Sequence, residues 1–211
     1  MKHLIIIGVG GFAREVYWHA KTSIGYGDEW DIKGFLDGDV KLSQNEYNKL
    51  SVGVLGDIND YVIQLDDVFV CAIGEPKVKA KLVGRVLERG GRFINLIHTT
   101  ASICETARMG MGNILLPNSC LSDNVTIGDY TTINTFSGLG HDAELGDFST
   151  LSSGVDIMGY AKVGSKVFLG SGARALPHSK IEDNAYVGAG SIVFKRVKKG
   201  LKVFGNPALP I

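Results

Sequence analysis

The clearest pattern in the chain is a bulky aliphatic residue at every sixth position from Ile97 to Val193. All 17 members of this column are Ile, Leu, Val or Met, except Ala175. Four positions after each of them stands Ala, Ser, Thr or Val, with Asn113 as the one exception. A helix would repeat every 3.6 residues and a plain strand every 2. A period of six therefore predicts a short strand followed by a corner.

The positions between the two columns are rich in residues that tolerate unusual backbone angles, as corners require. Asp123-Asn124, Ser153-Gly154 and Asp183-Asn184 are examples. Glycine is also abundant, at 28 of 211 residues, or about 13% where about 7% is usual. Three hexads close one triangular coil of 18 residues, so the pattern predicts a prism of stacked coils with the bulky column inside. Residues 18 apart should lie above one another.

Residues 1–96 lack the hexad and predict a different domain. Apolar runs predict strands over 3–8, 31–36 and 68–73 and a last strand over 92–96, which leads into the prism. Helices are expected over 13–21 and over 76–88, where Val78, Leu82 and Val86 would form the buried face. Strands that alternate with helices predict a small parallel sheet, a Rossmann-like βαβ domain. We therefore expect an α/β domain over 1–96 and a β-helix with a C-terminal tail over 97–211.

The first strand of this sheet runs into the turn Gly8-x-Gly10-x-x-Ala13. Such glycines let a phosphate-bearing ligand approach the backbone at a helix N-terminus. Asp37 and Gly74 follow two other expected strands, and the carboxyl ends of parallel strands form the ligand crevice. Asp37 lies 29 residues beyond Gly8, where a dinucleotide site places its acid after about 20. A nucleotide-linked ligand is favoured over NAD and over a purely structural turn.

Charge and cysteine content exclude several classes of protein. The 22 basic residues balance the 22 acidic ones, which argues against a nucleic-acid partner held by bulk electrostatics. Cys71, Cys104 and Cys120 are widely spaced and form neither a metal motif nor a disulfide framework. The apolar start is too short for a signal peptide or a membrane span. We expect a cytoplasmic protein without a metal site and without a membrane or nucleic-acid partner.

The hexads resemble the left-handed parallel β-helix of the hexapeptide acyltransferases. With the α/β domain in front, the chain is similar to bacterial nucleotide-sugar acetyltransferases of the sialic-acid O-acetyltransferase type. The motifs that carry this resemblance are the glycine turn at 8–11, Phe35-Leu36-Asp37, Ala72-Ile73-Gly74, Asn95-Leu96-Ile97-His98, Gly140-His141-Asp142 and Val203-Phe204-Gly205-Asn206-Pro207-Ala208. The resemblance implies a left-handed coil, a homotrimer and acetyl-CoA as the co-substrate.

His141 is the most informative of the five histidines. It falls on a corner, directly before Asp142, and the 18-residue register puts Asp123 and Gly159 on either side of it. Gly159 has no side chain, so a slot should open beside the imidazole. An imidazole suits the task of taking a proton from an attacking amine. In the family, a His–acid pair at this point is catalytic, which assigns His141 as the general base and Asp142 as its partner.

The resemblance also places the remaining contacts residue by residue. The nucleotide sugar would touch Gly10, Gly11, Phe12, Asp37 and Gly74. Coenzyme A would touch Thr150, Gly159, Ser171 and Ala189. Five cations between Lys195 and Lys202 could capture phosphates of coenzyme A, or they could form a solvated cap.

The predicted reaction is transfer of an acetyl group from acetyl-CoA to the amine of a nucleotide-linked amino-sugar. A 4-amino-4,6-dideoxy sugar fits the family. Two alternatives stay open at this point. One is O-acetylation of sialic acid or a related free sugar, and the other is a non-catalytic β-helix that binds a nucleotide sugar.

Overall fold

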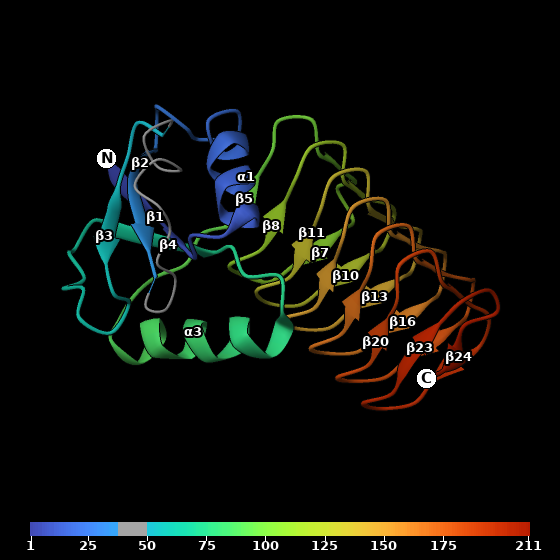
Figure 1. The fold of residues 1–211 in the computed structure, drawn as a ribbon. Helices are drawn as coiled ribbons and strands as arrows, with labels where there is room; N and C mark the ends of the chain where they lie inside the picture. Colours follow the sequence, from blue (N-terminus) through green and yellow to red (C-terminus); the bar gives the residue numbers. More distant parts are fainter. Residues whose placement is uncertain (38–49) are drawn as a thin grey trace.

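A computed structural model describes residues 1–37 and 50–211 of the chain. It has two parts, an N-terminal α/β part and a β-helix that extends away from it to the C-terminus (Figure 1). Within the part of the chain that the structure describes, no helix is long and apolar enough to cross a membrane.

The N-terminal part is a four-stranded parallel sheet with two helices. Its elements are β1 (Lys2–Ile7), α1 (Gly11–Ala20), β2 (Trp30–Leu36), β3 (Val54–Gly56), β4 (Asp67–Cys71) and α3 (Pro76–Glu88). The strand order is β3-β2-β1-β4, and all the pairs are parallel. The prediction of a small parallel sheet is therefore confirmed, with β1 between β2 and β4.

Three details of the predicted α/β part are wrong. The segment 92–96 forms only an isolated bridge between Phe93 and Phe69, and the next strand begins at Leu96. The short strand β3 was not expected from the sequence. It has only three residues, and all of them are exposed in the structure. In α3 the buried face carries Lys79, Val83 and Val86, whereas Val78 is 46% exposed. Val83 and Val86 pack into the core on this side, and the Lys79 ammonium there finds acceptors on the β-helix.

The β-helix has three faces, which the chain visits in turn. The first face is β5 (Leu96–Ile97), β8 (Ile114–Leu115), β11 (Thr132–Ile133), β14 (Thr150–Leu151), β17 (Phe168–Leu169), β20 (Tyr186–Val187), β23 (Lys202–Phe204) and β24 (Leu209–Pro210). The second face is β6 (Ser102–Ile103), β9 (Cys120–Leu121), β12 (Gly138–Leu139), β15 (Asp156–Ile157), β18 (Arg174–Ala175) and β21 (Ile192–Val193). The third face is β7 (Arg108–Met109), β10 (Thr126–Ile127), β13 (Glu144–Leu145), β16 (Lys162–Val163), β19 (Lys180–Ile181) and β22 (Arg196–Val197).

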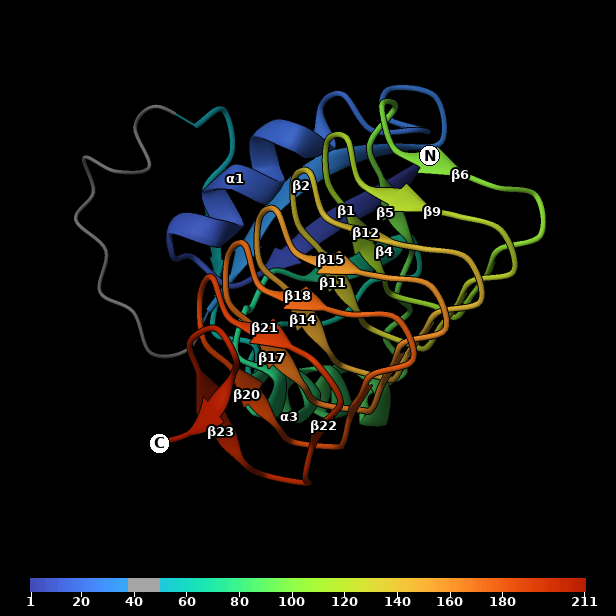
Figure 2. The ribbon, with the colours of Figure 1, turned by 90° about the vertical axis from the view of Figure 1, so that its right-hand side faces the viewer.

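The register of these faces is the one that the hexads predict. Each strand from β5 to β21 ends on a member of the bulky column, and these residues point into one continuous core. Paired strands are one 18-residue coil apart, so Thr132 pairs with Thr150 and Gly138 pairs with Asp156. Figure 2 views the prism obliquely from the side of its C-terminal coils and shows the coils staggered one behind the next.

The corners follow an equally strict rule. Every sixth residue from Gly112 to Gly190 has a positive φ, and φ lies between 54° and 71° at all of them. Asn and Gly occupy some of these positions, as the sequence pattern predicts. Others hold aromatic or charged side chains, among them Tyr130, Phe148 and Lys166, which rarely adopt this conformation. The stacking of coils therefore imposes the corner geometry even where the residue does not favour it.

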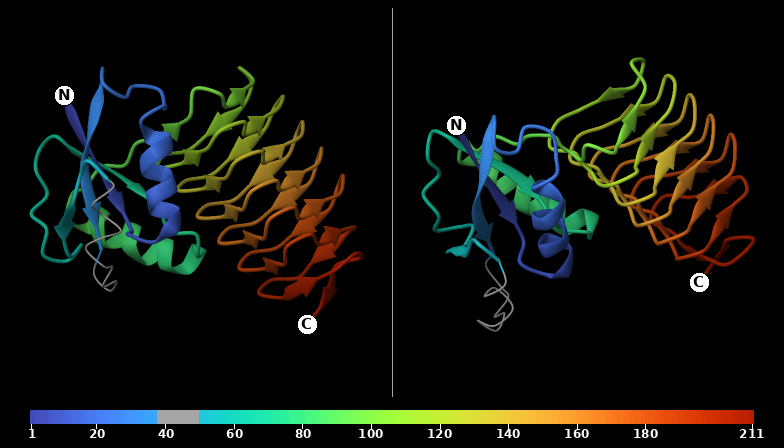
Figure 3. Two further views of the ribbon diagram at one scale, coloured as in Figure 1. Left: turned by 45° about the horizontal axis from the view of Figure 1, so that its top comes forward. Right: turned by 90° about the horizontal axis from the view of Figure 1, so that it is seen from above.

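The α/β part packs on the start of the first face and on the edge between the third and first faces (Figure 3). Val16 of α1 shares a core with Leu96 and Ile114, and Val83 of α3 shares a core with Tyr130. His98 lies at this junction, 8% exposed, with its Nε2 atom 2.8 Å from Thr22 Oγ1. The two parts therefore form one packed body, and the second and third faces are left uncovered by the α/β part.

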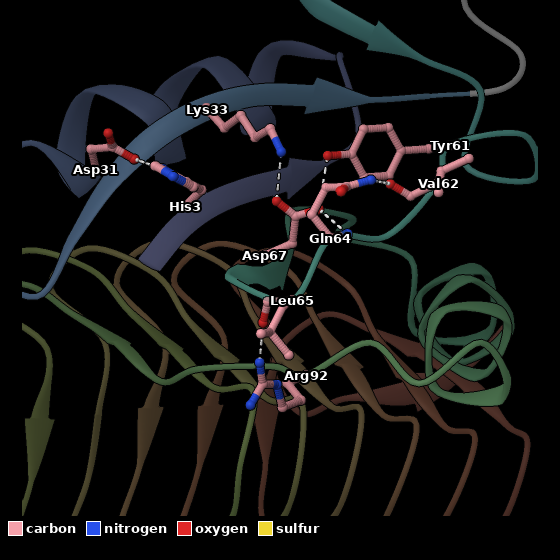
Figure 4. A network of polar contacts seen from close by, with 9 residues as sticks. All are labelled: His3, Asp31, Lys33, Tyr61, Val62, Gln64, Leu65, Asp67 and Arg92. Carbon is pink, nitrogen blue, oxygen red and sulfur yellow. Dashed lines mark hydrogen bonds and ion pairs between the residues drawn. The ribbon is translucent and has the colours of Figure 1, made fainter. Parts of the chain in front are cut away.

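Far from the β-helix, a buried carboxylate ties the strands of the α/β part together (Figure 4). Asp67 is 1% exposed and accepts bonds from Lys33 Nζ at 2.7 Å, Tyr61 Oη at 2.8 Å and Gln64 N at 2.7 Å. Burial alone would raise the pKa of the Asp67 carboxyl, but these bonds together hold it below its usual value. The ionised carboxylate therefore stabilises the folded sheet.

We expect Asp67→Ala to lower the free energy of unfolding by about 3 kcal/mol at pH 7, because it leaves three polar partners unpaired. The pKa of Asp67 is lower in the folded chain than in the unfolded chain. Its contribution is therefore complete above pH ~4 and is lost as the pH falls further. Urea unfolding at one protein concentration, at pH 7 and pH 3, measures both effects. The neighbouring exposed Asp66→Ala is the matched control. A loss below about 1 kcal/mol at pH 7 would contradict this role.

Candidate functional site

The carboxyl edge of the parallel sheet gathers the residues that the sequence pattern assigned to a ligand crevice. Gly8 follows β1, Asp37 follows β2 and Gly74 lies just beyond β4. The Gly8 amide donates to Leu36 O at 2.8 Å, so the glycine turn is fastened to the end of β2. Gly8 has a φ of 109°, and a Cβ atom there would lie 3.1 Å from Ala72 O. Only glycine fits this turn without strain.

The N-terminus of α1 opens at the same edge. Gly10 is the N-cap residue, with extended backbone and no side chain that caps the helix, and the first turn holds no acidic residue. Among residues 1–37 and 50–211, nothing lies within 4 Å of a Cβ atom placed on Gly10 or Gly11, so the described part of the chain leaves space in front of both residues. Open N–H groups at a helix N-terminus attract anions such as phosphates.

A pocket of about 410 Å³ lies between this helix end and the first face of the β-helix; we call it the interdomain pocket. Its lining residues are Gly11, Phe12, Glu15, Gly74, Thr132, Asn134, Thr150, Ser152, Ser153, Phe168 and Ser171. The lining from the β-helix is dominated by hydroxyl and amide groups. The pocket therefore offers many hydrogen-bond partners to a polar ligand.

His141 lies on the edge between the second and third faces, just after β12. Its Nδ1 atom is 3.0 Å from Asp142 Oδ2, and the side chains of His141 and Asp142 are 57% and 29% exposed. Neighbouring residues in a strand point apart. Here the two side chains meet because Asp142 is a corner residue, with a φ of 60°. The corner at Asp142 thus allows the contact between the His141 and Asp142 side chains that the sequence suggested.

Residues one coil away hold this pair in place. Asn124 Nδ2 donates to Asp142 Oδ1 at 2.7 Å, and this bond, followed by the contact with His141, holds the pKa of Asp142 below its usual value. A Cβ atom at Gly159 would lie 2.7 Å from both Cε1 and Nε2 of His141. The imidazole therefore packs directly against the backbone of residue 159, and it can do so only because that residue is glycine. The Tyr160 ring meets the His141 ring edge-on, with centroids 5.1 Å apart.

The two halves of the predicted site lie on different sides of the prism. Gly11, Phe12, Gly74, Thr150 and Ser171 line the interdomain pocket. Ala189 is one coil beyond Ser171, on the edge between the first and second faces. Gly159 instead lies beside His141 and Asp142, on the edge opposite the first face. Gly10 and Asp37 stand at the sheet edge next to the pocket but are not among its lining residues.

Four neighbours of the predicted site were not foreseen from the sequence. Asn124 and Tyr160 are one coil before and after Asp142, so the 18-residue register could have found them. Thr132 lies one coil before Thr150 in the same way. Lys79 has no such signal, because its place beside these threonines depends on how α3 docks.

Comparisons with known proteins agree with this architecture. The family model described as the PglD N-terminal domain matches residues 3–86. The search of curated proteins found no match. Among solved structures, the acetyltransferase domain of PglB from Neisseria gonorrhoeae, in complex with acetyl coenzyme A, is 25% identical. The match covers 100% of this chain and 99% of that one, with a TM-score of 0.87.

Two further structures are similar over the full length. PerB from Caulobacter crescentus, in complex with CoA and GDP-perosamine, is 28% identical, with 100% of this chain and 98% of that chain covered and a TM-score of 0.88. WeeI from Acinetobacter baumannii is 26% identical, with 100% of both chains covered and a TM-score of 0.87. The predicted fold, an α/β domain followed by a left-handed parallel β-helix, is confirmed. The class that these likenesses support is an acetyltransferase enzyme.

Proposed function

We propose that the chain transfers an acetyl group from acetyl-CoA to the amine of a nucleotide-linked amino-sugar, of which a 4-amino-4,6-dideoxy sugar is the best candidate. The observation that carries this proposal is the exposed imidazole of His141, which a carboxylate orients and which packs against Gly159. The similar structures support it, since PerB was solved with CoA and GDP-perosamine. Variants of that perosamine N-acetyltransferase with a histidine replaced were crystallised with the same ligands.

The geometry gives each residue of the pair a role. Because Asp142 is held ionised and accepts from Nδ1, the second ring nitrogen, Nε2, carries the lone pair. The sugar amine attacks the thioester carbonyl carbon, a C–N bond forms and the C–S bond breaks. His141 Nε2 takes the proton that the amine loses and returns it to the departing CoA sulfur. Asp142 stabilises the imidazolium that forms in between.

We infer further that the active site forms between two copies of the chain, in a homotrimer. Within one chain, His141 and Gly159 lie on the edge opposite the first face, whereas Thr150, Ser171 and the α1 N-terminus meet at the interdomain pocket. A second copy whose His141 edge lies against this pocket would bring the two sets together. Phe136 stands on the edge beside the pocket and is 72% exposed, which favours a partner that covers it.

The α/β part would hold the nucleotide moiety. The uncapped N-terminus of α1 faces the space in front of Gly10 and Gly11, where the phosphates would bind. Asp37, at the end of the neighbouring strand, would contact the ribose or the base.

A sialic-acid O-acetyltransferase would use the same His–Asp pair, but a free sugar does not need the phosphate site at α1. A non-catalytic binding protein would have no use for an exposed imidazole that a carboxylate orients. Acetyl-CoA consumption against UDP-, GDP- and dTDP-linked 4-amino-sugars, with free sialic acid included, separates the three. Turnover with one of the nucleotide sugars is the expected result. Turnover with sialic acid alone, or with none of them, would overturn the proposal.

His141→Ala should lower kcat by roughly 10²- to 10⁴-fold, because it removes the general base. Asp142→Asn should lower kcat less, since it alters the orientation and basicity of the imidazole but leaves it in place. Asp142 stays ionised beside the imidazole, because its hydrogen bonds hold its pKa below the usual value. Steady-state kinetics at pH 7 measure the kcat of each variant. His178→Ala, one coil beyond Tyr160 on the same edge, is the control. Near-normal turnover by His141→Ala would remove the mechanism.

Gly10→Val should raise the KM for the nucleotide sugar about tenfold or more, because its side chain enters the space where phosphates meet the helix N–H groups. The KM for acetyl-CoA should stay nearly constant. The backbone of Gly10 is extended and no described residue lies within 4 Å of its Cβ position, so the variant should fold. Asp37→Ala should act in the same direction, more mildly. Gly159→Leu should impair acetyl-CoA use first. If Gly10→Val weakened acetyl-CoA alone, the division into two sites would be wrong.

A further inference from the structure

Lys79 is a buried cation that the reaction described above does not use. It lies in the first turns of α3 and is 1% exposed. In Figure 1 this end of α3 is the one that reaches the β-helix. Its Nζ atom donates to Thr132 Oγ1 and to Thr150 Oγ1, both at 2.9 Å. The carbonyl oxygen of Ser149 is 3.5 Å away. A lysine buried this completely requires partners, and the hydroxyl pair on β11 and β14 supplies them.

These two bonds determine where the threonine hydroxyl hydrogens can point. An ammonium group only donates, so each Oγ1 atom acts as the acceptor and its own hydrogen must turn elsewhere. Both threonines also line the interdomain pocket. Among the described residues, the hydrogen-bond partner of each of these two hydroxyl groups is Lys79 Nζ. Both hydroxyl hydrogens are therefore free to point toward the pocket.

We infer that Lys79 is a positioning residue that holds the Thr132 and Thr150 hydroxyls as a pair of donors aimed into the interdomain pocket, where they bind an oxygen acceptor of the ligand. Two adjacent O–H donors with a cation behind them match a carbonyl or phosphate oxygen. Thr132 thereby becomes a binding residue beside Thr150. This inference rests on the proposed function, in which that acceptor is the thioester carbonyl oxygen of acetyl-CoA or a phosphate oxygen of a substrate.

The protonation of Lys79 gives the inference a distinctive signature. Burial lowers the pKa of Lys79 to about 7, and the nearby Glu75 opposes this shift. Burial also raises the pKa of the Cys71 thiol to about 12, so the thiol beside Lys79 is neutral. The Glu75 side chain accepts a hydrogen bond from Val78 N and thereby caps the first turn of α3. A neutral amine can accept a bond, so on deprotonation one threonine hydrogen can turn from the pocket to Nζ. Ligand affinity should then fall as the pH rises above about 7.

The test measures the Kd values of acetyl-CoA, CoA and inorganic pyrophosphate by calorimetry from pH 6 to 9. Full-length protein with the His141→Ala substitution is used throughout, so that the test does not depend on the proposed general base. Lys79→Met, and the double variant Thr132→Val with Thr150→Val, should each weaken the same probe about three- to tenfold. Loss of the preference for acetyl-CoA over CoA identifies a carbonyl acceptor. Loss of pyrophosphate binding identifies a phosphate acceptor.

Two further results separate positioning from a merely structural role. Lys79→Met added to the double threonine variant should weaken binding no further, because Lys79 acts through the hydroxyls. The fall of affinity above pH 7 should be absent in every variant that lacks Lys79, and Lys79→Arg should keep the affinity and lose the pH dependence. If Lys79→Met lowers stability but leaves all three Kd values and their pH dependence unchanged, the inference is overturned while the proposed function stands. If the protein with Lys79 intact binds none of the probes, both fail.

Discussion

The stacking of one 18-residue coil on the next is the constraint on which the rest of the structure depends. Parallel pairing between residues 18 apart holds every strand in register and forces a positive φ at every sixth residue from Gly112 to Gly190. The His141 site follows directly from this. Asp142 can turn back to its neighbour because it is a corner residue, Asn124 reaches it from the coil before, and Gly159 in the coil after makes room for the imidazole.

The same constraint divides the chemistry between separate edges of the prism. A side chain on one face cannot reach the opposite edge, because the continuous aliphatic core lies between them. The α/β part docks on the first face and builds the interdomain pocket there, while the His141 edge stays free of it. Oligomerisation is then the simple way to join a ligand-binding pocket to a general base on the opposite edge. The buried Lys79 ammonium fits this division. It donates to Thr132 and Thr150, two lining residues of the pocket, from the side that the α/β part covers.

Most of the β-helix could be predicted from the sequence, because its contacts repeat with the period of the pattern. The strands ending on Ile97, Leu151 and Val193 were predicted in this way. The closeness of His141 to Gly159 followed from the same arithmetic. The α/β part was predicted in outline, but β3 and the orientation of α3 were missed. Both depend on contacts between elements far apart in the chain, which local patterns do not record. The burial of Lys79 is the clearest case. A lysine in a helix is expected to be exposed, and only its acceptors on the β-helix explain why this one is buried.

The most direct measurement is complementation between two inactive variants. Chains with His141→Ala and chains with Gly10→Val are co-expressed with different tags, and the mixed oligomers are purified through both tags. They are assayed with the nucleotide sugar far below the KM of the Gly10→Val variant. If the His141 edge of one copy serves the pocket of another, some sites combine an intact base with an intact pocket. Turnover should then return to about a third of the wild-type value, because every mixed trimer contains one intact site among its three. If each chain forms its site alone, no mixed oligomer contains an intact site, and activity that stays at the level of the separate variants would contradict the account.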